Sequence, residues 1–199
     1  MSGARWLIEM LGTSMPHCRL TALWIILAAL SAVTGAQATT PSEGSVRLGR
    51  ALESLQKLAI TVSTMEKECA ESFPMAAGDN RATVRAFLQG EAVVVLKVSE
   101  TWKRLSAERP RDVQAFYWVS QRRLNSEILR LKGLPESERA FEGECIRFFR
   151  DIKSGALRRA MSDSFSLVQS FADDPASATP TYPFLDAIAK DLSGPGAPE

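Results

Sequence analysis

The side chains best suited to chemistry in this chain are three cysteines and a single histidine. Thiolates and imidazoles supply many of the nucleophiles, general bases and transition-metal ligands of proteins. The histidine, His17, and one cysteine, Cys18, lie before a long apolar run, whereas Cys69 and Cys145 lie far beyond it. The chemistry open to the chain therefore depends on whether its N-terminal segment stays attached.

That segment has the pattern of a secretory signal peptide. A nearly unbroken apolar run from Leu20 to Thr34 follows Arg19, and the small-x-small pattern Ala36-Gln37-Ala38 comes next. The run is shorter than the roughly twenty residues that a bilayer span needs. We expect residues 1–38 to be cleaved off after Ala38, with export to the periplasm or the medium. The alternative is an uncleaved N-terminal helix that anchors the protein at the membrane.

Cleavage would leave a mature chain without histidine. Such a chain has no Ser-His-Asp or Cys-His mechanism and no histidine ligands for zinc, copper or haem. The sequence also lacks Cys-x-x-Cys, the Walker loop and Gly-x-Gly-x-x-Gly. We therefore expect no catalytic residues, no cofactor and no metal site. The chain has 24 basic and 23 acidic residues, so its small net charge creates no strong electrostatic field. Nucleic acid is therefore not an expected partner.

We expect Cys69 and Cys145 to form a disulfide. Each lies on the apolar stripe of a predicted helix and so points toward the core. The two helices, the first and the fourth, are neighbours in an up-down bundle, and export would place the pair in an oxidising compartment. The alternative is two buried free thiols that pack as small hydrophobic side chains.

An aromatic run followed by two arginines is a possible interaction surface. Phe116, Tyr117 and Trp118 are consecutive, so at least one must be half-exposed or face another element. Arg122 and Arg123 follow one turn later and could contact an acidic partner or lipid headgroups. The alternatives are that the C-terminal segment covers the aromatic residues and that the arginines are ordinary surface charges.

A group of glutamates would gather near one end of the bundle if the disulfide forms: Glu66, Glu68, Glu71, Glu142 and Glu144. Close carboxylates can bind a cation or act as an acid and a base. The alternative is a solvated acidic face, balanced by Lys67 and Arg147. The sequence favours this second interpretation, because neighbouring charges on helices are usually exposed.

Apolar residues recur at steps of three and four along most of the mature chain, which predicts an all-α fold. The expected helices begin near Ser45, after Asp79-Asn80, at Pro110, at Pro135 and after Gly155, and Gly90 is a weak point in the second of them. We expect an up-down antiparallel bundle of four to five helices over residues 45–172. The remaining parts are a flexible leader (39–44), a linker (173–182), a short helix (183–192) and a disordered tail (193–199).

A resemblance adds to this pattern. The arrangement Cys69-x-x-x-Phe73-Pro74, a second cysteine before a paired aromatic, and then Ser154-Gly155 resembles small exported helical proteins of bacterial envelopes that have no assigned function. It covers about two-thirds of the chain and implies no activity.

The sequence as a whole predicts a non-enzymatic envelope protein that binds another envelope protein or the membrane surface, with no particular oligomeric state indicated. One alternative is a carrier or sensor that holds a small apolar ligand between its helices. A further alternative is a carboxylate-based enzyme.

Overall fold

The computed structural model describes residues 41–133, 137–176 and 178–192. Several sequence expectations lie outside these ranges: the signal peptide over 1–38, the first two residues of the leader, the helix start at Pro135, and the tail over 193–199. The described residues from Ser42 onward belong to one compact unit.

The first described helix is α2 (Glu43–Ser72), and the residues that flank it favour a helix boundary at each end. The Ser42 hydroxyl accepts a hydrogen bond from the backbone N–H of Ser45 at 3.1 Å and so caps the N-terminus. At the other end Phe73, which precedes Pro74, leaves the helical conformation. The Ser42 cap starts the helix two residues before the expected position, so the end of the predicted leader is helical.

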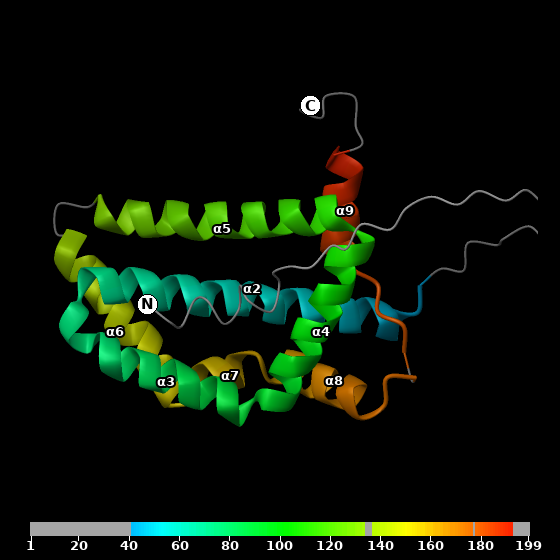
Figure 1. The fold of residues 1–199 in the computed structure, drawn as a ribbon, viewed down its shortest axis with the longest axis horizontal. Helices are drawn as coiled ribbons and strands as arrows, with labels where there is room; N and C mark the ends of the chain where they lie inside the picture. Colours follow the sequence, from blue (N-terminus) through cyan, green and yellow to red (C-terminus); the bar gives the residue numbers. More distant parts are fainter. Residues whose placement is uncertain (1–40, 134–136, 177, 193–199) are drawn as a thin grey trace, which may run out of the picture. The chain divides into compact units, whose positions relative to one another are not determined.

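Further helices follow in the described ranges (Figure 1): η1 (Pro74–Ala76), α3 (Ala77–Gly90), α4 (Ala92–Glu108), α5 (Pro110–Lys132), α6 (Ser137–Lys153), α7 (Ala156–Ala160), α8 (Ser162–Asp173) and α9 (Pro183–Leu192). No strand occurs among these residues, and the all-α class is confirmed. None of the described helices combines the length and the apolar character needed to cross a bilayer.

Two predicted helices are each divided in the structure. The predicted second helix is broken after Gly90, where Glu91 leaves the helical conformation and separates α3 from α4. The reason is that α3 packs against α6, whereas α4 packs against α8. In Figure 1, α4 crosses the direction of α2 instead of continuing α3. The predicted fifth helix is divided at Met161 into α7 and α8. Gly155, with a φ of 73°, makes the left-handed turn between α6 and α7.

Two apolar clusters form the interior, and α2 contributes to both. The first lies between the N-terminal half of α2 and α4, α5, α8 and α9, and it includes the buried Trp102. The indole N–H of Trp102 donates to the carbonyl of Leu52 at 3.4 Å, which satisfies the polar atom of a fully buried ring. The second cluster lies between the C-terminal half of α2 and α3, α5 and α6.

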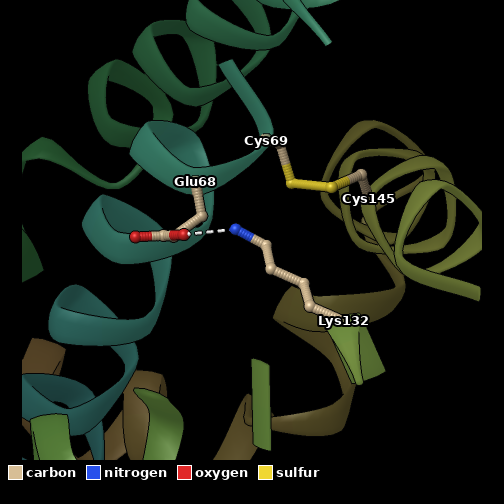
Figure 2. Close-up of a disulfide and its surroundings, with 4 residues drawn as sticks. All are labelled: Glu68, Cys69, Lys132 and Cys145. Carbon is tan, nitrogen blue, oxygen red and sulfur yellow. Dashed lines mark hydrogen bonds and ion pairs between the residues drawn. A yellow bond between two sulfur atoms is a disulfide. The ribbon is translucent and has the colours of Figure 1, made fainter. Parts of the chain in front are cut away.

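The disulfide lies in the second cluster and confirms the predicted pair. Cys69 on α2 and Cys145 on α6 have their Cα atoms 5.9 Å apart and are joined across 76 positions of sequence (Figure 2). Cys69 is fully buried, as its place on the apolar stripe indicated. The bond therefore fixes the end of the longest described helix to α6.

Candidate functional site

The aromatic run of α5 divides between the core and the surface. Phe116 is fully buried, with its ring centroid 4.5 Å from that of Trp102, so its assignment to an interaction surface is wrong. Tyr117 is half-buried, and its hydroxyl accepts a hydrogen bond from the Gln56 amide at 2.5 Å. Trp118 is 59% exposed. The helical rotation of 100° per residue separates the three side chains in this way.

We define the α5 outer face by six exposed residues: Arg111, Trp118, Val119, Arg122, Arg123 and Leu129. Four of them follow one another at steps of seven, four and seven, which places them on one stripe of the helix. This stripe is opposite the buried residues Val113, Phe116 and Ile128. In Figure 1, α5 lies along one edge of the view, with α9 projecting past it at one end. The sequence indicated Trp118, Arg122 and Arg123 of this face but not Arg111, Val119 and Leu129.

The charges of this face are not neutralised within the described residues. The two acidic residues of α5 are already paired, Asp112 with Arg109 at 2.8 Å and Glu127 with Arg130 at 2.6 Å. In the described part of the chain, the three arginines of the α5 outer face have no carboxylate within ion-pair distance. Arg122 instead lies over the Trp118 ring, 4.9 Å from its centroid. This cation–π contact holds an exposed indole and a guanidinium side by side.

A second polar site, which the sequence analysis missed, holds α9 in place. Glu53 on α2 is only 3% exposed, and its Oε1 atom accepts hydrogen bonds from the backbone N–H groups of Phe184 and Leu185, both at 3.0 Å. These N–H groups belong to the first turn of α9, where they have no partner within the helix. Glu53 therefore caps α9 from a distant part of the chain.

Two cations complete the attachment of α9. The Lys57 ammonium lies 3.7 Å from the centroid of the Phe184 ring. Arg109 donates to Asp186 at 2.7 Å and also to Asp112, so it joins α9 to the start of α5. These contacts account for Glu53 as a structural carboxylate, and they explain why a charged residue lies beside the apolar stripe of α2.

Burial raises the pKa of the Glu53 carboxyl above its ordinary value of 4.5, although the two N–H donors and the charge of Lys57 act in the opposite direction. The folded protein therefore holds the Glu53 proton more tightly than the unfolded chain does. The stability that results is complete below pH 4.5 and is lost as the pH rises through the folded-state pKa.

We predict that Glu53→Gln, which keeps an oxygen acceptor without the charge, becomes more stable relative to the parent as the pH rises from 4.5 toward neutrality. Glu53→Leu, which removes the acceptor, should be less stable than the parent by about 1–3 kcal/mol at pH 7. Urea unfolding of the three proteins across this range measures both effects. A constant difference between Glu53→Gln and the parent would contradict the raised pKa.

The glutamates near the disulfide do not form one site in the described structure. Glu68 binds Lys132 at 2.8 Å, as Figure 2 shows, and Glu66 lies 3.6 Å from Arg81. The remaining ion pairs of this region are Lys67–Glu71 and Arg147–Glu144. No group of three or more potential metal ligands occurs among the described residues. Each of these four glutamates has its own cation, so the arrangement is that of a balanced polar surface.

A shallow hollow of about 300 Å³ lies between α2, α5 and α6. Its apolar wall comprises Met65, Leu124, Ile128 and Leu131, and its rim carries Glu127, Arg130, Glu144 and Arg147. The volume is at the lower end of the range for ligand pockets. A larger hollow beside Trp118 is lined by α5 residues alone and is open to solvent.

The fold and these contacts define a class of protein: a disulfide-linked, all-α protein with a basic, tryptophan-bearing helix face. No family model, curated protein or solved structure matches the chain. What this protein does must therefore be inferred from its own residues.

Proposed function

We propose that this protein is exported to the cell envelope and acts there by binding, through the α5 outer face, and not by catalysis. The observation that carries the proposal is Trp118, which is 59% exposed and lies among arginines that have no carboxylate partner in the described structure. Tryptophan and arginine are the residues most enriched where binding energy is concentrated. An indole held by Arg122 on the outside of a rigid helix is therefore well placed to contact a partner.

Two features support export. The first is the apolar run from Leu20 to Thr34, followed by the small-x-small pattern that ends at Ala38. The second is the disulfide between Cys69 and Cys145, because such bonds persist in oxidising compartments and are rare in reducing ones. The two features lie in different parts of the chain and point to the same compartment.

The roles of the ionisable groups favour binding over catalysis. Glu53, the described carboxyl whose pKa is raised by burial, has its Oε1 atom occupied by the N–H groups of α9. Its neighbour Lys57 is stacked on Phe184. Both groups hold the fold together, whereas the arginines of the α5 outer face are exposed and have no carboxylate partner in the described structure.

Expression of the full chain in a bacterial host tests the proposal. Mass spectrometry of the recovered protein should show Thr39 as its first residue, and the protein should remain with washed envelopes. Trp118→Ala combined with Arg122→Gln and Arg123→Gln should release it. A matched control replaces exposed residues on other helices, Leu96→Ala with Arg47→Gln and Arg85→Gln, and should stay bound. Export without envelope association, or equal release of both variants, would contradict the proposal.

A second candidate function is a carrier of a small apolar ligand. It rests on the hollow beside Met65, whose wall is apolar and whose volume of about 300 Å³ fits a small molecule. Native mass spectrometry of the exported product would detect a retained ligand. Ile128→Trp, which fills the hollow from its wall, should abolish that signal.

A further inference from the structure

We propose that the α5 outer face binds the surface of an anionic phospholipid bilayer, with α5 lying along the membrane plane. This inference rests on the proposed function, because it names the partner of the same face. The charge, the side-chain chemistry and the shape of this face favour a lipid surface over an acidic protein.

The charge of the face favours an anionic partner. Arg111, Arg122 and Arg123 are exposed and have no carboxylate partner in the described part of the chain. The other basic residues at the two ends of α5 are neutralised, Arg109 by Asp112 and Asp186 and Lys132 by Glu68. Arg111 and Arg122 therefore place unpaired positive charge on the outward stripe of α5, and Arg123 adds exposed charge beside it, on the side of Lys57. Clustered basic residues attract anionic headgroups over about one Debye length.

The side chains of the face suit the bilayer interface. Trp118 has an apolar ring with a polar N–H, which is the character that places tryptophan at the headgroup level. Arg122 covers the ring from 4.9 Å and can extend its guanidinium to phosphate while its stem stays on apolar surface. Leu129 is 68% exposed on the same stripe and adds a second apolar group that can enter the interface.

The shape of the face also favours a flat partner. α5 has 23 residues and is therefore about 35 Å long. The hollow beside Trp118 is lined by residues of α5 only, so no neighbouring helix forms a wall there. A protein partner usually anchors its central side chains in a closed pocket. An open stripe along one helix can instead lie on a planar surface over its full length.

Vesicle binding of the exported product tests the inference. The probes are phosphatidylcholine vesicles with and without about 30 mol% phosphatidylglycerol. The difference spectrum between the parent and Trp118→Phe isolates the emission of Trp118. We expect this emission to shift to shorter wavelength with anionic vesicles only. Arg122→Gln/Arg123→Gln should weaken the binding about 30-fold, because each basic residue contributes roughly a fivefold increase in affinity.

The control is Arg47→Gln/Arg85→Gln, which removes the same charge from α2 and α3 and should bind like the parent. Failure of the parent to bind anionic vesicles, or equal binding by both double variants, overturns the inference. Binding to native envelopes before and after protease treatment distinguishes a protein partner from a lipid surface. Binding to untreated envelopes alone identifies a protein partner, which refutes the lipid surface and keeps the proposed function. Binding to none of these preparations refutes both.

Discussion

We expect the replacement of Cys69 and Cys145 together by alanine to lower the free energy of unfolding by at least about 4 kcal/mol. The bond closes a loop across 76 positions, so its loss returns the conformational entropy of a long loop to the unfolded chain. Removal of two buried sulfur atoms from the second apolar cluster adds a packing loss. Urea unfolding at 25 °C, compared between the oxidised parent and the double variant, measures the change.

The reduced parent is the matched control, because it keeps every sulfur atom and loses only the covalent bond. It should be less stable than the oxidised parent by about 4 kcal/mol, and more stable than the double variant by the packing loss. Alkylation without reductant, followed by mass spectrometry, should label neither Cys69 nor Cys145. Labelling of both residues in the folded parent, or a stability change below about 1 kcal/mol on reduction, would contradict a structural disulfide.

The burial of each cysteine was predictable because that information is local, and the pairing followed from the expected neighbouring positions of the two helices. Cys69 is one turn from Met65 on the stripe of α2, and Cys145 is one turn from Phe141 on the stripe of α6. A cysteine on the apolar stripe of an amphipathic helix faces the core, whichever element covers that stripe. The end of α2 and the start of α5 were predictable for the same reason, since Pro74 and Pro110 restrict the backbone of their immediate neighbours.

The division of the predicted second helix was not predictable in this way. Gly90 marks a weak point, but propensity alone does not decide between a continuous helix and a break. The decision depends on two different partners, α6 for α3 and α8 for α4, and on the ion pair between Glu91 and Arg158 at 2.8 Å. These partners lie far away in the sequence, so tertiary packing overrides the local periodicity.

The α5 outer face and the Glu53 site show the same contrast between local and tertiary information. The run of three aromatic residues required at least one exposed or covered ring, but which of Phe116 and Trp118 faces the core depends on the rotation of α5 about its axis, since the two lie on opposite sides of the helix. The structure determines that rotation through the contact of Phe116 with Trp102. Glu53 could not be assigned at all, because its hydrogen-bond partner at Phe184 lies 131 positions away. Only the folded chain shows that this carboxylate caps a helix.

Gly49→Ala is expected to destabilise the protein by about 3 kcal/mol, although alanine is the better helix former. A Cβ atom at position 49 would lie 1.3 Å from the carbonyl oxygen of Thr181. Thr181 belongs to the segment that leads into α9, and its N–H donates to the carbonyl of Ser45 at 3.1 Å. The obstacle is backbone and cannot rotate away, so the segment must move and weaken the capping of α9 by Glu53.

Gly143→Ala is the matched control, because Gly143 lies inside α6 and an added Cβ meets no atom within 4 Å. It should stabilise the protein by about 0.5–1 kcal/mol, the ordinary gain of alanine over glycine in a helix. Urea unfolding of both variants, with amide exchange at Leu185 and Ile188 as a local probe, tests the contrast. Stability changes of opposite sign in the two variants, with faster amide exchange in α9 for Gly49→Ala only, would show that the close approach of Thr181 to α2 holds α9 in place. Equal gains at both positions would show that the Thr181 segment yields easily and that α9 is held by its side chains alone.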